Sequence, residues 1–165
     1  EQLGWRVPDV VVYPTGGGEG TVGIWKALAE LAAGGWLAGD RVQPRYVVAQ
    51  AEGCAPIARA YAAGNDRAEP WVDPVTYAAG LRVPSPLGDR VLLRILRETQ
   101  GVAGTAGEDE MRRWTRRLAE ATGIDAAPEG GCALVVLRDA VQAGRIAADS
   151  EVVVYNTGSG ASYRA

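Results

Sequence analysis

Histidine is missing from this sequence of 165 residues, and cysteine is scarce. Without histidine the chain cannot supply a histidine general base, a Ser-His-Asp triad or the common zinc sites. The two cysteines, Cys54 and Cys132, are too few and too far apart for a zinc ribbon or a disulfide scaffold. Each follows a glycine where a helix is expected to begin, a position that can lower a thiol pKa. The alternative, which we prefer, is that both are small buried residues in a reducing cytoplasm.

The sequence also has few lysines and no long run of apolar residues. Lys26 is the only lysine, the sixteen arginines are spread along the chain, and the net charge is −3. We expect no nucleic-acid partner, because nothing here would neutralise a run of phosphates. No stretch approaches the roughly 20 apolar residues of a membrane span, and no signal peptide opens the chain, so we expect a cytoplasmic protein without a membrane partner. No initiator methionine precedes Glu1, and we expect the chain to begin within a longer polypeptide.

Apolar residues are abundant and they follow two periodicities. Short apolar runs at residues 9–13, 46–49 and 151–155 predict buried strands. Helical spacing predicts helices at residues 21–33, 56–63, 108–122 and 131–143, with a further helix around residues 92–96 after a proline-rich loop at 83–89. Strands that alternate with helices indicate an α/β fold with a doubly wound, mostly parallel sheet. We expect one domain, residues 1–165.

The turn after the first predicted strand is rich in glycine. Gly16, Gly17, Gly18 and Gly20 stand between a strand and a helix, an arrangement that binds phosphate through backbone N–H groups and the helix amino terminus. A tight turn without a ligand is the alternative, but four glycines in five residues exceed what a turn requires. The dinucleotide fingerprint also fits residues 18–23, although the acid it needs is misplaced, and the Walker pattern fails because no Gly-Lys-Ser/Thr follows.

Polar turns also follow the other two predicted strands, at residues 52–53 and 156–160. In open α/β sheets the ligand crevice lies outside the carboxyl ends of the strands. The sequence therefore indicates a ligand site at one edge of the domain.

Five segments in series resemble the β-family of pyridoxal-phosphate enzymes, also called fold type II, and threonine synthases above all. They are residues 14–20 (PTGGGEG), 51–56 (AEGCAP), 80–89 (GLRVPSPLGD), 128–130 (PEG) and 156–160 (NTGSG). The segments come in family order and cover essentially the whole chain. The resemblance implies that the chain is the carboxy-terminal portion of such an enzyme, forms most of its larger cofactor domain, and takes pyridoxal 5′-phosphate as cofactor.

The resemblance also implies roles for particular residues. It assigns the cofactor phosphate to Gly16, Gly17, Gly18, Gly20 and the N–H of Thr21. It sets the Thr157 hydroxyl against the pyridine nitrogen, whereas a hydroxyl that bonds to its own turn is the alternative. No metal is expected. The implied reaction converts O-phosphohomoserine and water to threonine and phosphate. A threonine or serine dehydratase, and a non-catalytic remnant that uses the fold for binding, are the alternatives.

The lysine that holds the cofactor covalently lies, in that family, in the amino-terminal half, so the catalytic lysine is not expected in this chain. Lys26, in the helix after the glycine loop, is interpreted as a structural or surface lysine. We expect an amino-terminal half or companion subunit that carries the required lysine, and a homodimeric enzyme.

Two departures from the family stand out. Glu19 replaces a small residue, and its carboxylate would repel a phosphate unless it points away and caps the helix; residues 161–163 (ASY) replace the usual Leu-Lys-Tyr.

Overall fold

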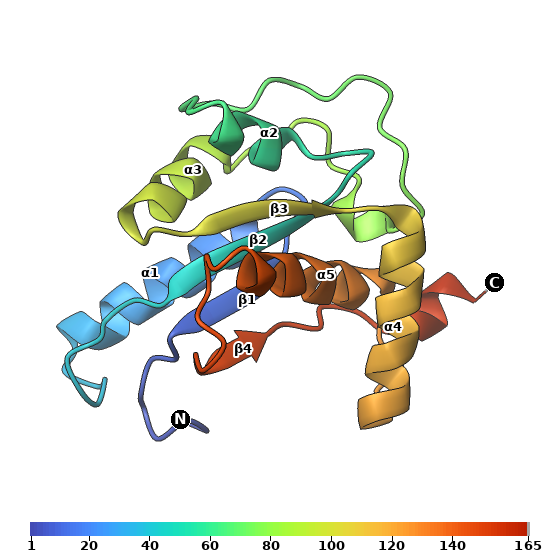
Figure 1. Cartoon of the computed structure of the whole chain (residues 1–165). Helices are drawn as coiled ribbons and strands as arrows, with labels where there is room; N and C mark the ends of the chain where they lie inside the picture. The colour runs from blue at the N-terminus through green and yellow to red at the C-terminus, as the bar shows by residue number, and fades with distance from the viewer. Residues whose placement is uncertain (165) are drawn as a thin grey trace.

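The sheet of this protein is parallel throughout. A computed structural model describes residues 1–164. Its four strands are β1 (Val10–Pro14), β2 (Arg45–Ala51), β3 (Val102–Ala106) and β4 (Val152–Val154), in the order β3-β2-β1-β4 (Figure 1). All three neighbouring pairs run parallel, with Val11 opposite Tyr46 and Val153. The predicted α/β fold with a mostly parallel sheet is confirmed.

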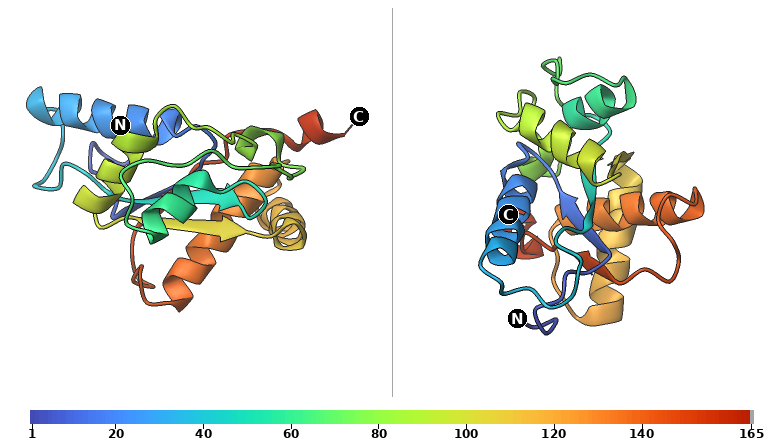
Figure 2. Two further views of the ribbon diagram at one scale, coloured as in Figure 1. Left: turned by 90° about the horizontal axis from the view of Figure 1, so that it is seen from above. Right: turned by 90° about the vertical axis from the view of Figure 1, so that its left-hand side faces the viewer.

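Helices connect the strands and cover both faces of the sheet. The helices are α1 (Glu19–Ala33), α2 (Pro56–Ala62), α3 (Asp89–Glu98), α4 (Glu108–Thr122) and α5 (Pro128–Gln142), with short 3-10 helices η1 (Ala79–Leu81) and η2 (Gly160–Tyr163). Helices α1, α2 and α3 lie on one face, whereas α5 lies on the other with α4 packed beside it (Figures 1 and 2). The sheet is therefore doubly wound, as the sequence predicts.

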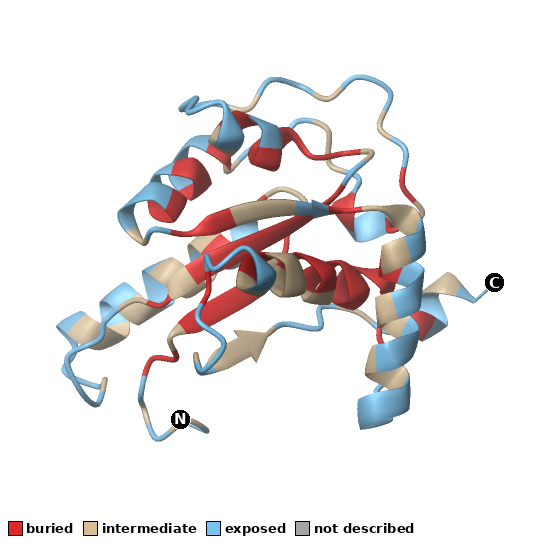
Figure 3. Ribbon diagram, viewed as in Figure 1, coloured by how far each residue is buried: buried red, intermediate tan, exposed pale blue. Residues whose placement is uncertain are grey.

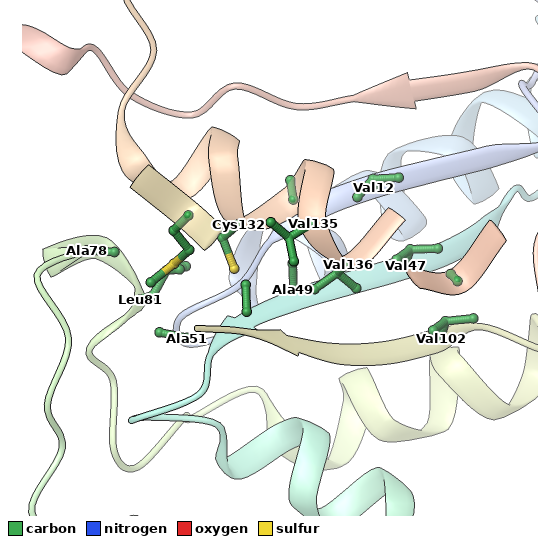
Figure 4. Close-up of a cluster of buried hydrophobic side chains, with 14 of the residues drawn as sticks. Val12, Val47, Ala49, Ala51, Ala78, Leu81, Val102, Cys132, Val135 and Val136 are labelled. Atoms are coloured by element: carbon green, nitrogen blue, oxygen red, sulfur yellow. The ribbon is translucent and has the colours of Figure 1, made fainter. Parts of the chain in front are cut away.

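Alternation along each strand divides the apolar residues between two cores. Val12 and Val47 belong to the core beneath α5, where Val136 packs against the sheet (Figure 4). Val11 and Val48 point the other way, into the core beneath α2 and α3. Both faces of β1 and β2 are thus buried, which explains why the centre of each strand is a continuous apolar run, Val10–Val12 and Tyr46–Ala49.

The order of the strands creates a switch point between β1 and β4. From β1 the chain moves by way of α1 to β2 and then β3, on one side of the sheet; after α4 and α5 it returns to the other side of β1 as β4. The carboxyl ends of β1 and β4 are therefore neighbours, while α1, which follows β1, and α5, which precedes β4, lie on opposite faces of the sheet. This is where open α/β sheets bind ligands.

Two elements differ from the sequence prediction. Strand β3 is absent from that prediction, because its sequence, VAGTA, carries little β-propensity. Its Gly104 lies under α5: a Cβ there would stand 2.7 Å from the Cγ1 of Val136. Helix α5 begins at Pro128, not near Gly131, since proline suits the first turn of a helix. At Gly131 the helix crosses α4 so closely that a Cβ would lie 2.2 Å from the Thr115 hydroxyl.

Burial is uneven over the molecule. Strands β1 and β2 are buried, β4 is half-buried, and α1 and α4 are largely exposed (Figure 3). Within residues 1–164 no helix combines the length and apolar character needed to cross a membrane.

Candidate cofactor site

The glycine loop joins the end of β1 to the start of α1, and two of its glycines are fixed by their surroundings. A Cβ on Gly16 would stand 2.5 Å from the carbonyl oxygen of Gly80, so no side chain fits there. Gly18 is the N-cap residue of α1 and has a φ of 99°, a conformation that favours glycine. The loop is anchored at both ends by backbone hydrogen bonds, from the Thr15 N–H to the Ala49 oxygen (2.7 Å) and from the Val22 N–H to the Gly18 oxygen (3.1 Å).

Glu19 lies against this loop and does not point away from it. One carboxylate oxygen is 2.3 Å from the place where a Cβ of Gly17 would stand, although the side chain is exposed. In residues 1–164 no hydrogen bond to the Glu19 carboxylate caps the helix. The carboxylate therefore puts negative charge at Gly17. Gly20 faces the other way, toward the ring of Tyr13, which would meet a Cβ at 2.3 Å.

Thr21 occupies the first turn of α1 and is fully buried. Its hydroxyl oxygen has no hydrogen-bond partner among the described residues. A buried hydroxyl without a partner costs free energy, and a native structure that keeps one calls for an explanation. The glycine loop, the amino terminus of α1 and this hydroxyl together suit a phosphate group, which would accept from all three. The chain's residues thus fit the phosphate end of the cofactor.

Thr157 lies in the turn after β4. It is exposed, and its hydroxyl makes no hydrogen bond within residues 1–164, so the alternative in which it satisfies its own turn is not observed. The turn is held by other groups: the Ala127 N–H donates to the Gly158 oxygen (3.1 Å), and the Ala161 N–H donates to the Ser159 hydroxyl (3.2 Å). The Thr157 hydroxyl is therefore left available to a ligand.

A cavity of about 250 Å³ brings several elements together beside Thr157. Its lining residues are Pro14, Gly80, Leu81, Ala127, Glu129, Thr157, Gly158, Ser159, Ser162 and Tyr163. The ends of β1 and β4 meet there, and the rings of Tyr13 and Tyr155 pack at a centroid distance of 5.3 Å. Of the six predicted site residues only Thr157 lines this cavity, whereas the five residues of the glycine loop and α1 start do not. A larger cavity of about 870 Å³ lies between residues 65–70 and 85–90 and includes none of the six. We assign the site to the smaller cavity, because it lies at the switch point.

Glu129 and Tyr163 also line this cavity, although the sequence pattern assigns neither of them an individual role. Glu129 lies in the first turn of α5 and is 6% exposed. Its Oε1 accepts hydrogen bonds from the Gly80 N–H (2.9 Å) and from the Tyr163 hydroxyl. Burial and the neighbouring Glu129 carboxylate raise the pKa of Tyr163. The Pro-Glu-Gly segment at residues 128–130 is a signal for this position, but its partners are far away in the sequence.

The two cysteines and Lys26 do not line the cavity beside Thr157. Cys54 and Cys132 are both fully buried, and burial raises the pKa of each thiol; at Cys132 the carboxylates of Glu129 and Glu108 raise it further. The preferred interpretation as small buried residues is confirmed, and a lowered thiol pKa is not observed. Lys26 is exposed on α1 and forms an ion pair with Glu30.

Comparison with known proteins defines the family to which this chain belongs. The family of pyridoxal-phosphate dependent enzymes matches residues 1–158, and the chain belongs to that family. Its cofactor is therefore pyridoxal phosphate, as the sequence predicts. Among curated proteins the chain is similar to threonine synthases. It is 31% identical over 158 residues to that of Methanosarcina acetivorans, covering 96% of this chain and 38% of the relative. It is 28% identical to that of Methanocaldococcus jannaschii, covering 97% and 39%.

Solved structures support the fold. A threonine deaminase from T.th. superposes with a TM-score of 0.65 and 25% identity, covering 92% of this chain and 50% of that one. An L-serine ammonia-lyase from Rhizomucor miehei superposes with a TM-score of 0.68 at 20% identity, covering 92% and 45%. The chain spans less than two fifths of the length of the threonine synthases named above.

Proposed function

We propose that this chain is the carboxy-terminal, cofactor-binding part of a threonine synthase-like lyase, which converts O-phosphohomoserine and water to threonine and phosphate. One observation carries the proposal: the glycine loop and Thr157 follow neighbouring parallel strands at the switch point. A ligand with a phosphate at one end and a ring nitrogen at the other needs such a pair of groups. Identity of up to 31% with threonine synthases supports this choice of reaction.

Each predicted residue then has a defined task. The N–H groups of residues 16–21 bind the phosphate, with the positive end of α1 and the buried hydroxyl of Thr21 behind them. The Thr157 hydroxyl meets the pyridine nitrogen. When bound, the cofactor withdraws electrons from the substrate carbons during elimination and replacement. A neutral hydroxyl, unlike a carboxylate, does not enforce a protonated ring, which makes this withdrawal milder.

We further infer a companion segment or subunit that provides the lysine, within a homodimeric cytoplasmic enzyme. Covalent capture of the cofactor needs a lysine amine at the aldehyde. Lys26 is seven residues beyond the start of α1 at Glu19, and thus about 10 Å along a helix that begins at the phosphate loop. The helix leads away from the ligand, so Lys26 does not meet this need.

A dehydratase acting on threonine or serine is the second candidate. The 25% identity with a threonine deaminase favours it, since both the fold and part of the sequence are shared. The two reactions differ in the products they release: threonine and phosphate in one case, ammonia and a 2-oxo acid in the other.

Product analysis separates these candidates. The enzyme, assembled with the companion that carries the lysine, is given O-phosphohomoserine or free threonine. We expect threonine and phosphate from the first; a 2-oxo acid from the second would support the dehydratase instead. Bound cofactor without either product would indicate a non-catalytic module.

The role of Thr157 is tested in the same assay. Thr157→Val removes a hydroxyl but little volume, and we expect turnover to fall by about tenfold or more because a hydrogen bond to the cofactor is lost. Thr105→Val, at an exposed position of β3, is the matched control and should retain full turnover. Unchanged turnover in Thr157→Val would remove Thr157 from the site.

A further inference from the structure

Glu129 is a buried carboxylate at the wall of the cofactor cavity. The residue is 6% exposed and stands in the first turn of α5. Its Oε1 accepts two hydrogen bonds, whereas its Oε2 is buried and has no partner among the described residues. An unpartnered buried carboxylate oxygen costs free energy that a neutral residue would not. Stability alone therefore does not account for a glutamate at this position.

The first hydrogen bond connects Glu129 to Gly80, which lies against the glycine loop (residues 16–20), the proposed phosphate loop. The Gly80 N–H donates to Oε1 at 2.9 Å. The carbonyl oxygen of Gly80 in turn packs on Gly16, 2.5 Å from where a Cβ of Gly16 would stand. The carboxylate thus fixes the segment that lies against the first glycine of the loop.

The second hydrogen bond connects Glu129 to the segment that follows Thr157. The donor is the hydroxyl of Tyr163, in helix η2. The Tyr163 ring also packs edge-to-face against Tyr77, with centroids 6.4 Å apart, close to the start of η1. Both Tyr163 and Gly80 line the cavity that contains Thr157.

We propose that Glu129 is a positioning residue of the cofactor pocket: its carboxylate fixes the spacing between the phosphate loop and the Thr157 turn. The proposal rests on the proposed cofactor site. The carboxylate joins three elements that are 34 and 49 residues apart in sequence, and no other described side chain bonds to both Gly80 and Tyr163. A ligand that spans both ends of the pocket depends on this spacing, and a ligand that occupies only the phosphate loop does not.

Two ligands test the proposal: pyridoxine 5′-phosphate, which has the ring and the phosphate but no aldehyde, and inorganic phosphate. Their dissociation constants are measured by calorimetry on the protein as isolated, after dialysis has removed bound cofactor. In Glu129→Ala we expect affinity for pyridoxine 5′-phosphate to fall about tenfold or more, because two hydrogen bonds to a charged group are lost. Affinity for inorganic phosphate should stay within about twofold, since the hydrogen bonds that anchor the loop run through Ala49 and Gly18.

Two further variants make the result decisive. Tyr163→Phe removes one of the two hydrogen bonds and keeps the carboxylate, and should give a smaller loss with the same selectivity for the ring. Glu151→Ala, at an exposed carboxylate beside the amino end of β4, is the control and should bind both ligands normally. Circular dichroism checks the fold of each variant.

Each outcome bears on a separate claim. Normal affinity for both ligands in Glu129→Ala and Tyr163→Phe would overturn the positioning role while leaving the cofactor site intact. Equal losses for both ligands would also overturn it, in favour of a general structural role; should Glu129→Ala fail to fold, Tyr163→Phe decides. A wild-type protein that binds neither ligand would overturn the proposed cofactor site itself.

Discussion

At the scale of single residues, the glycines of the phosphate loop serve different purposes. Gly16 is required by the carbonyl of Gly80, Gly18 by its positive φ, and Gly20 by the ring of Tyr13. Gly17 differs from these three, because a side chain there would meet only the flexible end of Glu19. A change at Gly17 therefore tests ligand approach with the least disturbance of the loop.

The carboxylate of Glu19 gives the first prediction. A negative charge within about 4 Å of a bound phosphate is repulsive by about 1 kcal/mol in a solvated setting. We expect Glu19→Gln to bind inorganic phosphate about fivefold more tightly, measured by calorimetry at low salt, with a smaller gain at high salt. Glu30→Gln, in the same helix but about three turns further on, is the control and should not change binding. Equal or weaker binding in Glu19→Gln would show that the carboxylate does not oppose the ligand.

The thiols give the second prediction. Because burial raises the pKa of Cys54 and Cys132, the folded chain holds less thiolate at pH 8 than the unfolded chain does. Neither sulfur is exposed, since both residues are fully buried. We expect iodoacetamide to modify the native protein at least about tenfold more slowly than the protein in urea. Rapid modification of either cysteine in the native state would contradict this.

At the scale of elements, the helices and strands with a clear hydrophobic pattern could be predicted from the sequence. Strands β1, β2 and β4 contain continuous apolar runs, and α4 has a clear apolar face, so each could be placed from sequence to within a few residues. Strand β3 could not, because its small residues acquire their conformation from pairing with β2 and from the packing of Val136 over Gly104. The start of α5 could not be placed for a related reason, because Gly131 is set by the close contact with α4 and not by helix propensity.

The site was partly predictable for the same reason. The glycine loop and Thr157 each follow a recognisable strand, so the edge of the sheet could be named in advance. The contacts of Glu129 with Gly80 and Tyr163 join residues far apart in the chain, and no local pattern indicates them. The position of the Glu19 carboxylate against Gly17 likewise depends on the side-chain conformation.

The crossing of α4 and α5 gives the third prediction. A Cβ at Gly131 would lie 2.2 Å from the Thr115 hydroxyl and 2.4 Å from the Met111 carbonyl oxygen. We expect Gly131→Ala to lower the free energy of unfolding by about 1–3 kcal/mol, since the helices must move apart. Gly23→Ala is the matched control: Gly23 is exposed within α1 with no atom within 4 Å of the added Cβ, so it should stabilise the protein by up to about 1 kcal/mol. Urea unfolding measures both, and a neutral Gly131→Ala would contradict the close crossing.

At the scale of the whole molecule, several large apolar side chains are exposed. Thr21 is the one buried residue of the fifteen in α1, although the helix is rich in apolar residues. Leu87 and Val72 are 93% and 78% exposed. With the proposed companion absent, we expect these exposed side chains to contribute to association of the isolated chain in solution.

We propose that this chain provides the cofactor pocket and that another segment provides the lysine. Reduction with borohydride in the presence of pyridoxal phosphate fixes the cofactor on any lysine that carries it, and peptide mapping then locates the label. For this chain alone we predict no stoichiometric label at Lys26 and no turnover; with the companion, the label should appear on a companion lysine. Stoichiometric labelling of Lys26, together with turnover by this chain alone, would contradict the account.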